Sequence, residues 1–176
     1  MSEIIPVAPV KLFCGMIAAN EKIIVEAKDR LRKFFGEIDL ESDLIPFDFT
    51  DYYRVEMGES LLRKFISFSD LIDPGRLARI KIQTNGIEKE LTVEMSGLRR
   101  TVNLDPGYIS ADKLVLATTK NFSHRIYLGE GIYAEVTLNF KKGTCVFFDW
   151  TYPDFKSGKY TPFFLKVRQN YMSAHV

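Results

Sequence analysis

The run from Val10 to Ala18 is short and nearly continuously apolar. Such a run is typical of a central β-strand that is covered on both faces. Asn20 follows at once as a candidate helix N-cap, and Gly36 provides the matching stop. Between them, apolar residues recur on one helical face at Ile23, Ile24, Ala27, Leu31, Phe34 and Phe35. The chain is therefore predicted to begin with a buried strand and an amphipathic helix.

The next segments extend this pattern into a mixed fold. They are predicted to form two strands, a helix and a further strand, at Ile38 to Phe47, Leu62 to Leu71, Asp73-Pro74 onwards, and Thr101 to Leu104. A turn at Asp105-Pro106-Gly107 is expected to close the last strand. The order βαββαβ predicts an α+β fold with a ferredoxin-like core, in which an antiparallel sheet carries two helices on one face.

The second half of the chain is predicted to extend this sheet. Ser110 to Asn121 is compatible with a helix or an extended segment. Three strands in a meander then follow, at Phe122 to Leu128, Ile132 to Phe140, and Thr144 to Trp150. A C-terminal helix begins at Thr161-Pro162. The sequence has no internal repeat or linker, so we expect residues 1–176 to form a single domain.

The turns of the meander decide which side chains share a face. A two-residue Glu130-Gly131 turn would set Ile126 opposite Glu135, with His124 on the same face. In the next hairpin, a two-residue Lys142-Gly143 turn would set Glu135 opposite Trp150. A three-residue loop starting at Lys141 would instead set Asp149 opposite Glu135, and we prefer it because it separates apolar from polar residues. The apolar face would then hold Val136, Leu138, Phe140, Val146, Phe148 and Trp150, and the polar face His124, Glu135, Thr137, Asn139 and Asp149.

The polar face is the candidate catalytic site, with His124, Glu135 and Asp149 as its central residues. An imidazole beside two carboxylates can transfer protons or bind a divalent metal, although an ordinary solvated sheet face has the same composition. Lys120 and Arg125 would fix an anionic group. The candidate ligand-binding residues are Asp51, Asp105, Tyr108, Lys120, Arg125 and Asp154.

Composition narrows the classes of function. The sequence has 24 Lys and Arg against 23 Asp and Glu, and this balance argues against binding to nucleic acid or to an anionic membrane. The apolar run from Leu12 to Ala19 is far shorter than the roughly 20 residues of a membrane span. Cys14 and Cys145 lie in apolar runs without C-x-x-C spacing, which is typical of buried thiols in a reducing compartment. We therefore expect a cytoplasmic protein.

Several longer stretches carry a family resemblance. They are FTDYY with EMG (residues 49–58), NLDPGY (103–108), ATTKNFSHRIYLGEGIYAEVTL (117–138) and WTYPDF (150–155). In this order and spacing the chain resembles the bacterial and archaeal family known as domain of unknown function 4416. Members are often labelled GTP-binding protein, so the resemblance implies nucleotide binding, but it assigns no catalytic residues.

The chain lacks the motifs of guanine-nucleotide switch proteins. Gly158-Lys159 is followed by Tyr160 where a phosphate-binding loop has Ser or Thr, and neither D-x-x-G nor N-K-x-D occurs. We therefore expect a protein that binds a small anionic ligand, either a nucleotide or another phosphate-bearing metabolite, with hydrolase or transferase chemistry if it is an enzyme. The alternatives are an interaction module with a tyrosine surface (Tyr52, Tyr53, Tyr108 and Tyr133) and, more remotely, an RNA-binding sheet.

Overall fold

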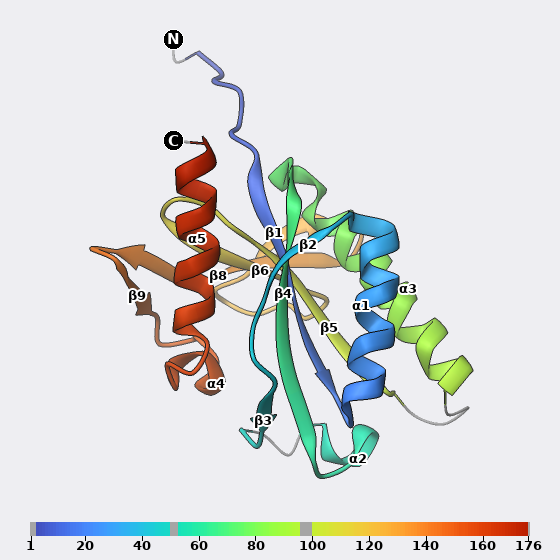
Figure 1. Ribbon diagram of the computed structural model, residues 1–176. Coiled ribbons are helices and arrows are strands. Elements are labelled where there is room, and N and C mark those ends of the chain that lie inside the picture. The colour runs from blue at the N-terminus through green and yellow to red at the C-terminus, as the bar shows by residue number, and fades with distance from the viewer. Residues whose placement is uncertain (1–2, 50–52, 96–99, 176) are drawn as a thin grey trace.

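The computed structural model describes residues 3–49, 53–95 and 100–175. It shows a mixed fold built on a nine-stranded antiparallel sheet with helices on both faces (Figure 1). The strands are β1 (Val10–Ala18), β2 (Ile38–Glu41), β3 (Ile45–Phe47), β4 (Leu61–Ile72), β5 (Val102–Ile109), β6 (Lys113–Thr118), β7 (Ile126–Gly129), β8 (Ile132–Lys141) and β9 (Thr144–Phe147). The helices are α1 (Glu21–Phe35), α2 (Arg54–Met57), α3 (Leu77–Met95), α4 (Pro153–Lys156) and α5 (Thr161–His175), with a 3₁₀ turn at Pro74–Arg76 before α3. None of the described helices is long and apolar enough to cross a membrane.

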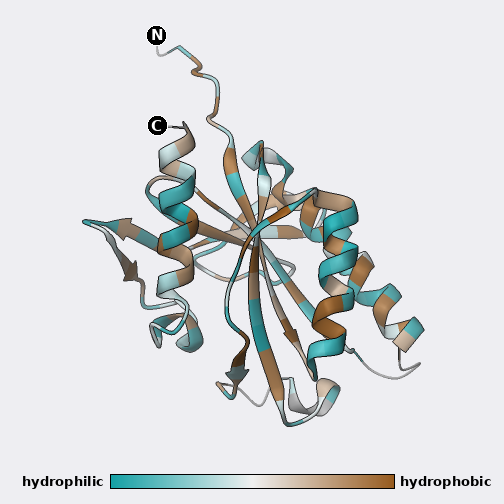
Figure 2. Cartoon of the chain, in the orientation of Figure 1, coloured by the Kyte–Doolittle hydropathy of each residue, from teal (hydrophilic) through white to brown (hydrophobic). Residues whose placement is uncertain are grey.

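The sheet order is β2-β4-β1-β5-β6-β8-β7, with β3 also paired to β4 and β9 also paired to β8. Strand β1 is central and buried along its whole length, as its apolar run predicts. Its Leu12, Cys14 and Met16 pack with α1 and α3 on one face, whereas Phe13 packs with α5 on the other. Hydrophobic residues alternate with hydrophilic ones along the strands and the helices that pack on them (Figure 2).

Both ends of α1 follow the sequence prediction. The Asn20 side chain accepts a hydrogen bond from the backbone N–H of Ile23 at 3.1 Å, which satisfies one of the free donors of the first turn. Gly36 ends the helix with φ at 90°, a conformation that favours glycine. Four of the six predicted inward positions are buried, but Phe34 near the end of the helix is 54% exposed and Phe35 is only half-buried.

Two expectations for the first half of the chain were wrong in detail. The segment from Ile38 to Phe47 forms two short strands, β2 and β3, which pair with successive parts of β4. The Asp105-Pro106-Gly107 stretch is not a turn but part of β5, where Pro106 lies opposite Cys14. Proline is tolerated there because β6 pairs with β5 only from Gly107 onwards, so no ladder bond to β6 is lost at Pro106.

The undecided segment after β5 is extended and forms β6. β5 and β6 pair only through Gly107–Ile109 and Leu114–Leu116, and beyond these residues they separate. Gly107 permits this close approach, because a Cβ atom there would lie 2.3 Å from the carbonyl oxygen of Val115. The sheet is therefore open between the first half of β5 and the end of β6.

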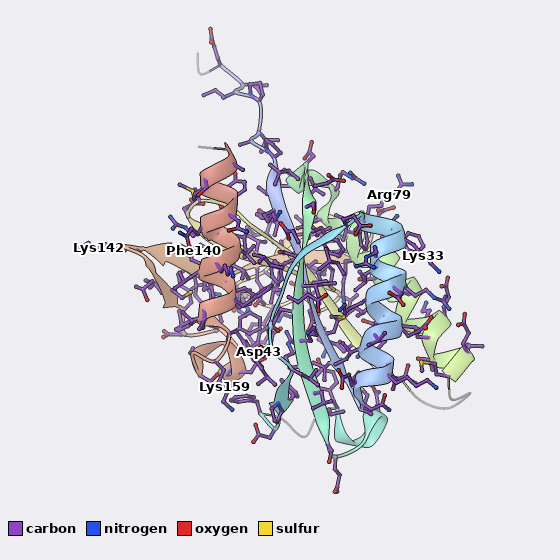
Figure 3. All side chains as sticks on the ribbon, in the orientation of Figure 1. Lys33, Asp43, Arg79, Phe140, Lys142 and Lys159 are labelled. Carbon is purple, nitrogen blue, oxygen red and sulfur yellow. The ribbon has the colours of Figure 1, made fainter. Side chains whose placement is uncertain are left out.

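The hairpins around β8 follow a different register from the preferred one. The second hairpin has the two-residue Lys142-Gly143 turn, with Lys141 opposite Thr144. In the first hairpin, Ile126 lies opposite Ala134 instead of Glu135, because a β-bulge adds a residue between Tyr127 and Gly129. β6 occupies one edge of β8, so β7 and β9 share the other edge and do not form a simple meander. Lys142 lies at the exposed tip of the second hairpin, and Phe140 lies further back beside α5 (Figure 3).

The expectation that Trp150 belongs to the core was also wrong. Leu138 and Phe140 are buried as predicted, but β9 ends at Phe147, so Phe148 and Trp150 leave the sheet. Trp150 is 41% exposed, and its indole N–H donates to the carbonyl of Val136 at 3.0 Å. Because β9 is shorter than predicted, Phe148 and Trp150 lie outside the core.

Helix α3 contains a glycine that the fold does not require. A Cβ atom on Gly86 would meet no atom within 4 Å, and the residue has helical backbone. Gly86→Ala should therefore stabilise the protein by about 0.5–1 kcal/mol, because alanine loses less backbone entropy on folding. Chemical denaturation measures the change, and a loss of stability would show that α3 packs more tightly at this position.

Candidate functional site

The opening between β5 and β6 leads into a cavity of about 700 Å³. Arg63 and Asp105 reach it from the sheet, and Lys81 and Glu88 reach it from α3. The largest groups among the remaining described lining residues come from the end of β6 with the residues after it and from α4 with the residue before it. The remaining lining residues are Ile17, Phe47, Phe49, Tyr53, Asn85, Lys89, Arg100, Asn103, Leu116, Ala117, Thr118, Thr119, Lys120, Glu135, Tyr152, Pro153, Asp154 and Phe155. Because β5 and β6 do not pair here, side chains of the sheet and of α3 line the same cavity.

Arg63 is the central charge of the cavity. It is only 2% exposed, and its Nη1 donates to Asp105 Oδ2 at 3.0 Å. Its guanidinium carbon lies 4.5 Å from the centre of the Phe65 ring and 5.8 Å from that of Phe155. The Nε donor has no hydrogen-bond partner among the described residues. A buried cation with an unused donor therefore lines the cavity.

Glycine at position 15 leaves space for this arginine. A Cβ atom there would lie 2.8 Å from both Arg63 Nη2 and a carbon of the Phe65 ring. Burial opposes the charge of Arg63, but the carboxylates of Asp105 and Asp154 outweigh burial and raise its pKa. Arg63 therefore remains protonated.

Two carboxyl groups beside Arg63 have opposite pKa shifts. Burial alone would raise the pKa of Asp105, but Arg63 and Lys81 outweigh it and hold this pKa below its usual value. Asn103 also donates to Asp105 Oδ2 at 2.7 Å. For Asp154, burial dominates over the attraction of Arg63 and raises the pKa. The site thus combines an ionised carboxylate with a carboxyl group that retains its proton more readily.

The α3 side of the cavity contains a second buried ionic cluster. Glu88 accepts from Arg100 Nη2 at 2.7 Å and from the backbone N–H of Leu104 at 2.7 Å. Lys81 donates to the carbonyl of Leu104 at 2.6 Å and lies 4.0 Å from Glu88. Burial raises the pKa of Glu88 even though Lys81 and Arg100 oppose it. These bonds fix α3 against β5 along the cavity wall.

Glu135 organises the opposite wall. Its side chain is buried, and Oε2 lies 2.8 Å from Arg125 Nε and 3.2 Å from His124 Nε2. Arg125 also donates to the carbonyl of Lys120 at 2.9 Å and to the Tyr152 hydroxyl at 2.7 Å. Arg125 therefore connects two segments that line the cavity.

The structure brings most of the predicted site residues together. Asp105, Lys120, Glu135 and Asp154 line the cavity, and His124 and Arg125 contact Glu135. Two others lie elsewhere. Asp149 is exposed after the end of β9, and the half-buried Tyr108 packs against the hydrophobic clusters around α3. Asp51 lies outside the described residues.

Arg63, Lys81 and Glu88 line the cavity but were missed by the sequence reasoning. One signal was available for Arg63. It alternates with Leu61 and Phe65 in β4, and all three are buried. A charged residue on the buried face of a strand needs a partner, and Asp105 is that partner.

The described residues contain no group of three His, Cys, Asp or Glu side chains arranged to hold a metal ion. His124, Glu135 and Asp149 are all among these residues, so the geometry gives no support to a metal site formed by the three.

One comparison with known proteins gave a match. Residues 8–171 match the family described as "Domain of unknown function (DUF4416)", and the chain therefore belongs to this family. No curated protein matches the chain, and no solved structure does.

Proposed function

We propose that this member of the DUF4416 family is a single-domain protein that binds a small anionic ligand, a nucleotide or another phosphate-bearing metabolite, in the cavity between β5 and β6. The observation that carries the proposal is Arg63, a buried cation that lines a cavity large enough for a metabolite. An oxyanion in the cavity would pair with this guanidinium charge.

The charges around the cavity support this choice of ligand. Among the described residues, five cations line it, namely Arg63, Lys81, Lys89, Arg100 and Lys120, against four acidic residues, namely Glu88, Asp105, Glu135 and Asp154. Arg125 does not line the cavity, but it donates to Glu135 and offsets its negative charge. The raised pKa of Asp154 favours its neutral form. The field inside the cavity is therefore positive, and exposed Lys89 and Lys120 extend it to the surface.

The same geometry defines the chemistry that an enzymatic reaction here would use. Asp154 would donate a proton to a ligand oxygen, and ionised Asp105 would orient Arg63. We assign Glu135 and His124 to holding Arg125 in place, since the Glu135 carboxylate already has Arg125, His124 and Thr137 as hydrogen-bonding neighbours.

A thermal-shift panel tests the proposal. Inorganic phosphate, pyrophosphate, sugar phosphates, nucleotides and dicarboxylates are added to the pure protein. A ligand at 100 times its dissociation constant should stabilise the fold by about 2.7 kcal/mol. The double variant Lys89→Ala, Lys120→Ala should bind the same ligand about tenfold or more weakly, because two cations at the cavity are lost.

The matched control is Lys33→Ala, Lys166→Ala, which removes the same charge from exposed positions on α1 and α5; Lys33 is labelled in Figure 3. Equal weakening in both double variants would indicate an effect of net charge, not of the cavity. A flat response of the wild-type protein across the panel would refute anion binding.

The other functions suggested by the sequence have less support. Tyr53 lines the cavity, Tyr108 packs near α3 and Tyr133 contacts Tyr127, so these three do not form one partner surface, and Tyr52 lies outside the described residues. For RNA binding, the outward rings already stack on one another, with His124 and Trp150 at 5.2 Å and 12°. These rings are therefore not arranged to stack on bases, and we do not propose RNA binding.

We also propose a ferredoxin-like core and a cytoplasmic location. The βαββαβ segment has the strand order β2-β4-β1-β5 with α1 and α3 on one face, and we interpret this as a ferredoxin-like core. Cys14 and Cys145 are both free thiols, which supports the cytoplasm as the expected compartment.

A further inference from the structure

Asp105 has one carboxylate oxygen that the fold leaves open to the cavity. Its Oδ2 accepts from Arg63 at 3.0 Å and from Asn103 at 2.7 Å, whereas no hydrogen bond from the described residues reaches Oδ1. The side chain lines the cavity and keeps 27% of its surface exposed. Because an ionised carboxylate only accepts hydrogen bonds, a molecule in the cavity is bound more tightly here if it presents N–H or O–H donors.

Neighbouring side chains fix the orientation of Asp105. The Asn103 amide that donates to Asp105 accepts in turn from Arg100 Nη2 at 2.5 Å, and Arg100 also donates to Glu88 at 2.7 Å. Asn103 is only 4% exposed. The carboxylate is therefore held in place before a ligand binds, as a site that discriminates between ligands by hydrogen bonding requires.

Aromatic rings surround this carboxylate. Five aromatic residues among the described ones line the cavity, namely Phe47, Phe49, Tyr53, Tyr152 and Phe155. The guanidinium carbon of Arg63, the partner of Asp105, lies 6.0 Å from the centre of the Phe47 ring and 5.8 Å from that of Phe155. Burial raises the pKa of Tyr53, and the nearby charge of Asp105 raises it further. A planar ring whose edge faces Asp105 would therefore pack against aromatic side chains.

The cavity is larger than an anionic group alone requires. Its volume of about 700 Å³ lies in the range of sites that enclose whole metabolites. Lys89 and Lys120 are exposed, whereas Arg63 and Asn103 are buried. A ligand with its anionic group at the two lysines and a ring at Asp105 would occupy both the outer and the inner part.

We propose, building on the anion binding proposed above, that Asp105 determines which ligands the cavity accepts, by selecting phosphorylated molecules whose ring carries adjacent N–H donors. Such an edge donates to the open Oδ1 atom while the ring packs against the aromatic wall. A ring with an acceptor at the same place would set its lone pair against those of Oδ1, and it would be bound less tightly.

Isothermal titration calorimetry of the full chain with three purine nucleoside 5′-monophosphates tests this selectivity. The guanosine ring edge carries two adjacent N–H donors, the inosine edge carries one, and the adenosine edge has an acceptor in the same place. The dissociation constants should increase in this order, and that of the adenosine compound should exceed that of the guanosine compound by about tenfold or more. Ribose 5-phosphate, which has no planar ring, should bind more weakly than the guanosine compound.

The variant Asp105→Asn tests the assigned residue. An amide presents a donor as well as an acceptor, so this variant should lose the preference for guanosine over adenosine. The matched control is Asp149→Asn, which makes the same chemical change at an exposed position outside the cavity and should keep the preference. If Asp105→Asn does not fold, the order of the three constants in the wild-type protein decides.

The outcomes separate this selectivity from anion binding itself. Equal binding of the three nucleotides, or an unchanged preference in folded Asp105→Asn, would overturn the role of Asp105 and leave anion binding intact. Ribose 5-phosphate that binds as tightly as the guanosine compound would show that sugar hydroxyls, not ring N–H groups, are recognised, and it would overturn the assigned class of ligand. No binding of these four compounds or of inorganic phosphate would refute both proposals.

Discussion

Replacing Arg63 by methionine should destabilise the protein by about 3 kcal/mol. Methionine fills a similar apolar volume but leaves Asp105 without its ion-pair partner at 3.0 Å. We expect the lower end of the range for broken buried pairs because the Asp105 side chain keeps 27% of its surface exposed. Urea denaturation of the two proteins at neutral pH measures the difference.

The pH dependence distinguishes this mechanism from simple loss of packing. In the wild-type protein the pKa of Asp105 is lowered, so this residue stabilises the fold above its unfolded pKa of about 3.9, and the contribution is lost as the pH falls through the folded pKa. Without Arg63, burial should raise the pKa of Asp105, and protonation then favours the folded variant. The stability deficit of Arg63→Met should therefore shrink as the pH falls towards about 4.

The double variant Arg63→Met, Asp105→Asn provides the control for this prediction. It removes both charges, so it should recover part of the stability that Arg63→Met loses, and its deficit should depend less on pH. A deficit that is constant across pH, with no recovery in the double variant, would attribute the loss to packing against Phe65 and Phe155 instead.

Gly107→Ala should also cost about 3 kcal/mol and lower the melting temperature by about 10 °C. The new Cβ atom would lie 2.3 Å from the carbonyl oxygen of Val115 and 2.8 Å from the Phe13 ring. A backbone atom cannot rotate away as a side chain can, so β5 and β6 would have to separate where they pair. Differential scanning calorimetry gives both quantities.

Gly86→Ala is the matched control, because it makes the same chemical change at a position with no neighbouring atom within 4 Å. The two variants should shift the melting temperature in opposite directions. A rise of the melting temperature in both variants would mean that backbone entropy outweighs the close approach of β5 and β6.

Local patterns predicted much of the fold. The β1 run, the Asn20 cap and the Gly36 stop follow from residue type and spacing alone, and the structure confirms all three. The turn predicted at Asp105-Pro106-Gly107 was wrong because turn propensity is local, whereas the pairing of β5 with β1 depends on residues about ninety positions away. The predicted three-residue loop at Lys141 was wrong for a related reason. The preferred register assumed that the last strand continues to Trp150, whereas β9 ends at Phe147.

The site was only partly predictable. The residue types suggested that Lys120, Arg125, Glu135 and Asp154 share a site, and the structure places Lys120, Glu135 and Asp154 around one cavity, with Arg125 bound to Glu135. The contributions of Lys81 and Glu88 could not be foreseen, because they reach the cavity through an opening between two strands whose pairing was unknown. Long-range topology, not residue type, decides that part of the site.

The opening between β5 and β6 also has a consequence for motion. Three residue pairs form the register between β5 and β6, so β2-β4-β1-β5 and β6-β8-β7 are joined along a short line, and we expect any relative motion of the two parts to occur there. A molecule held between Arg63 on one side and Lys120 on the other would bridge this line. Amide hydrogen exchange near the ends of β6 and α3 should then slow together when the cavity is filled, although these segments are distant in sequence.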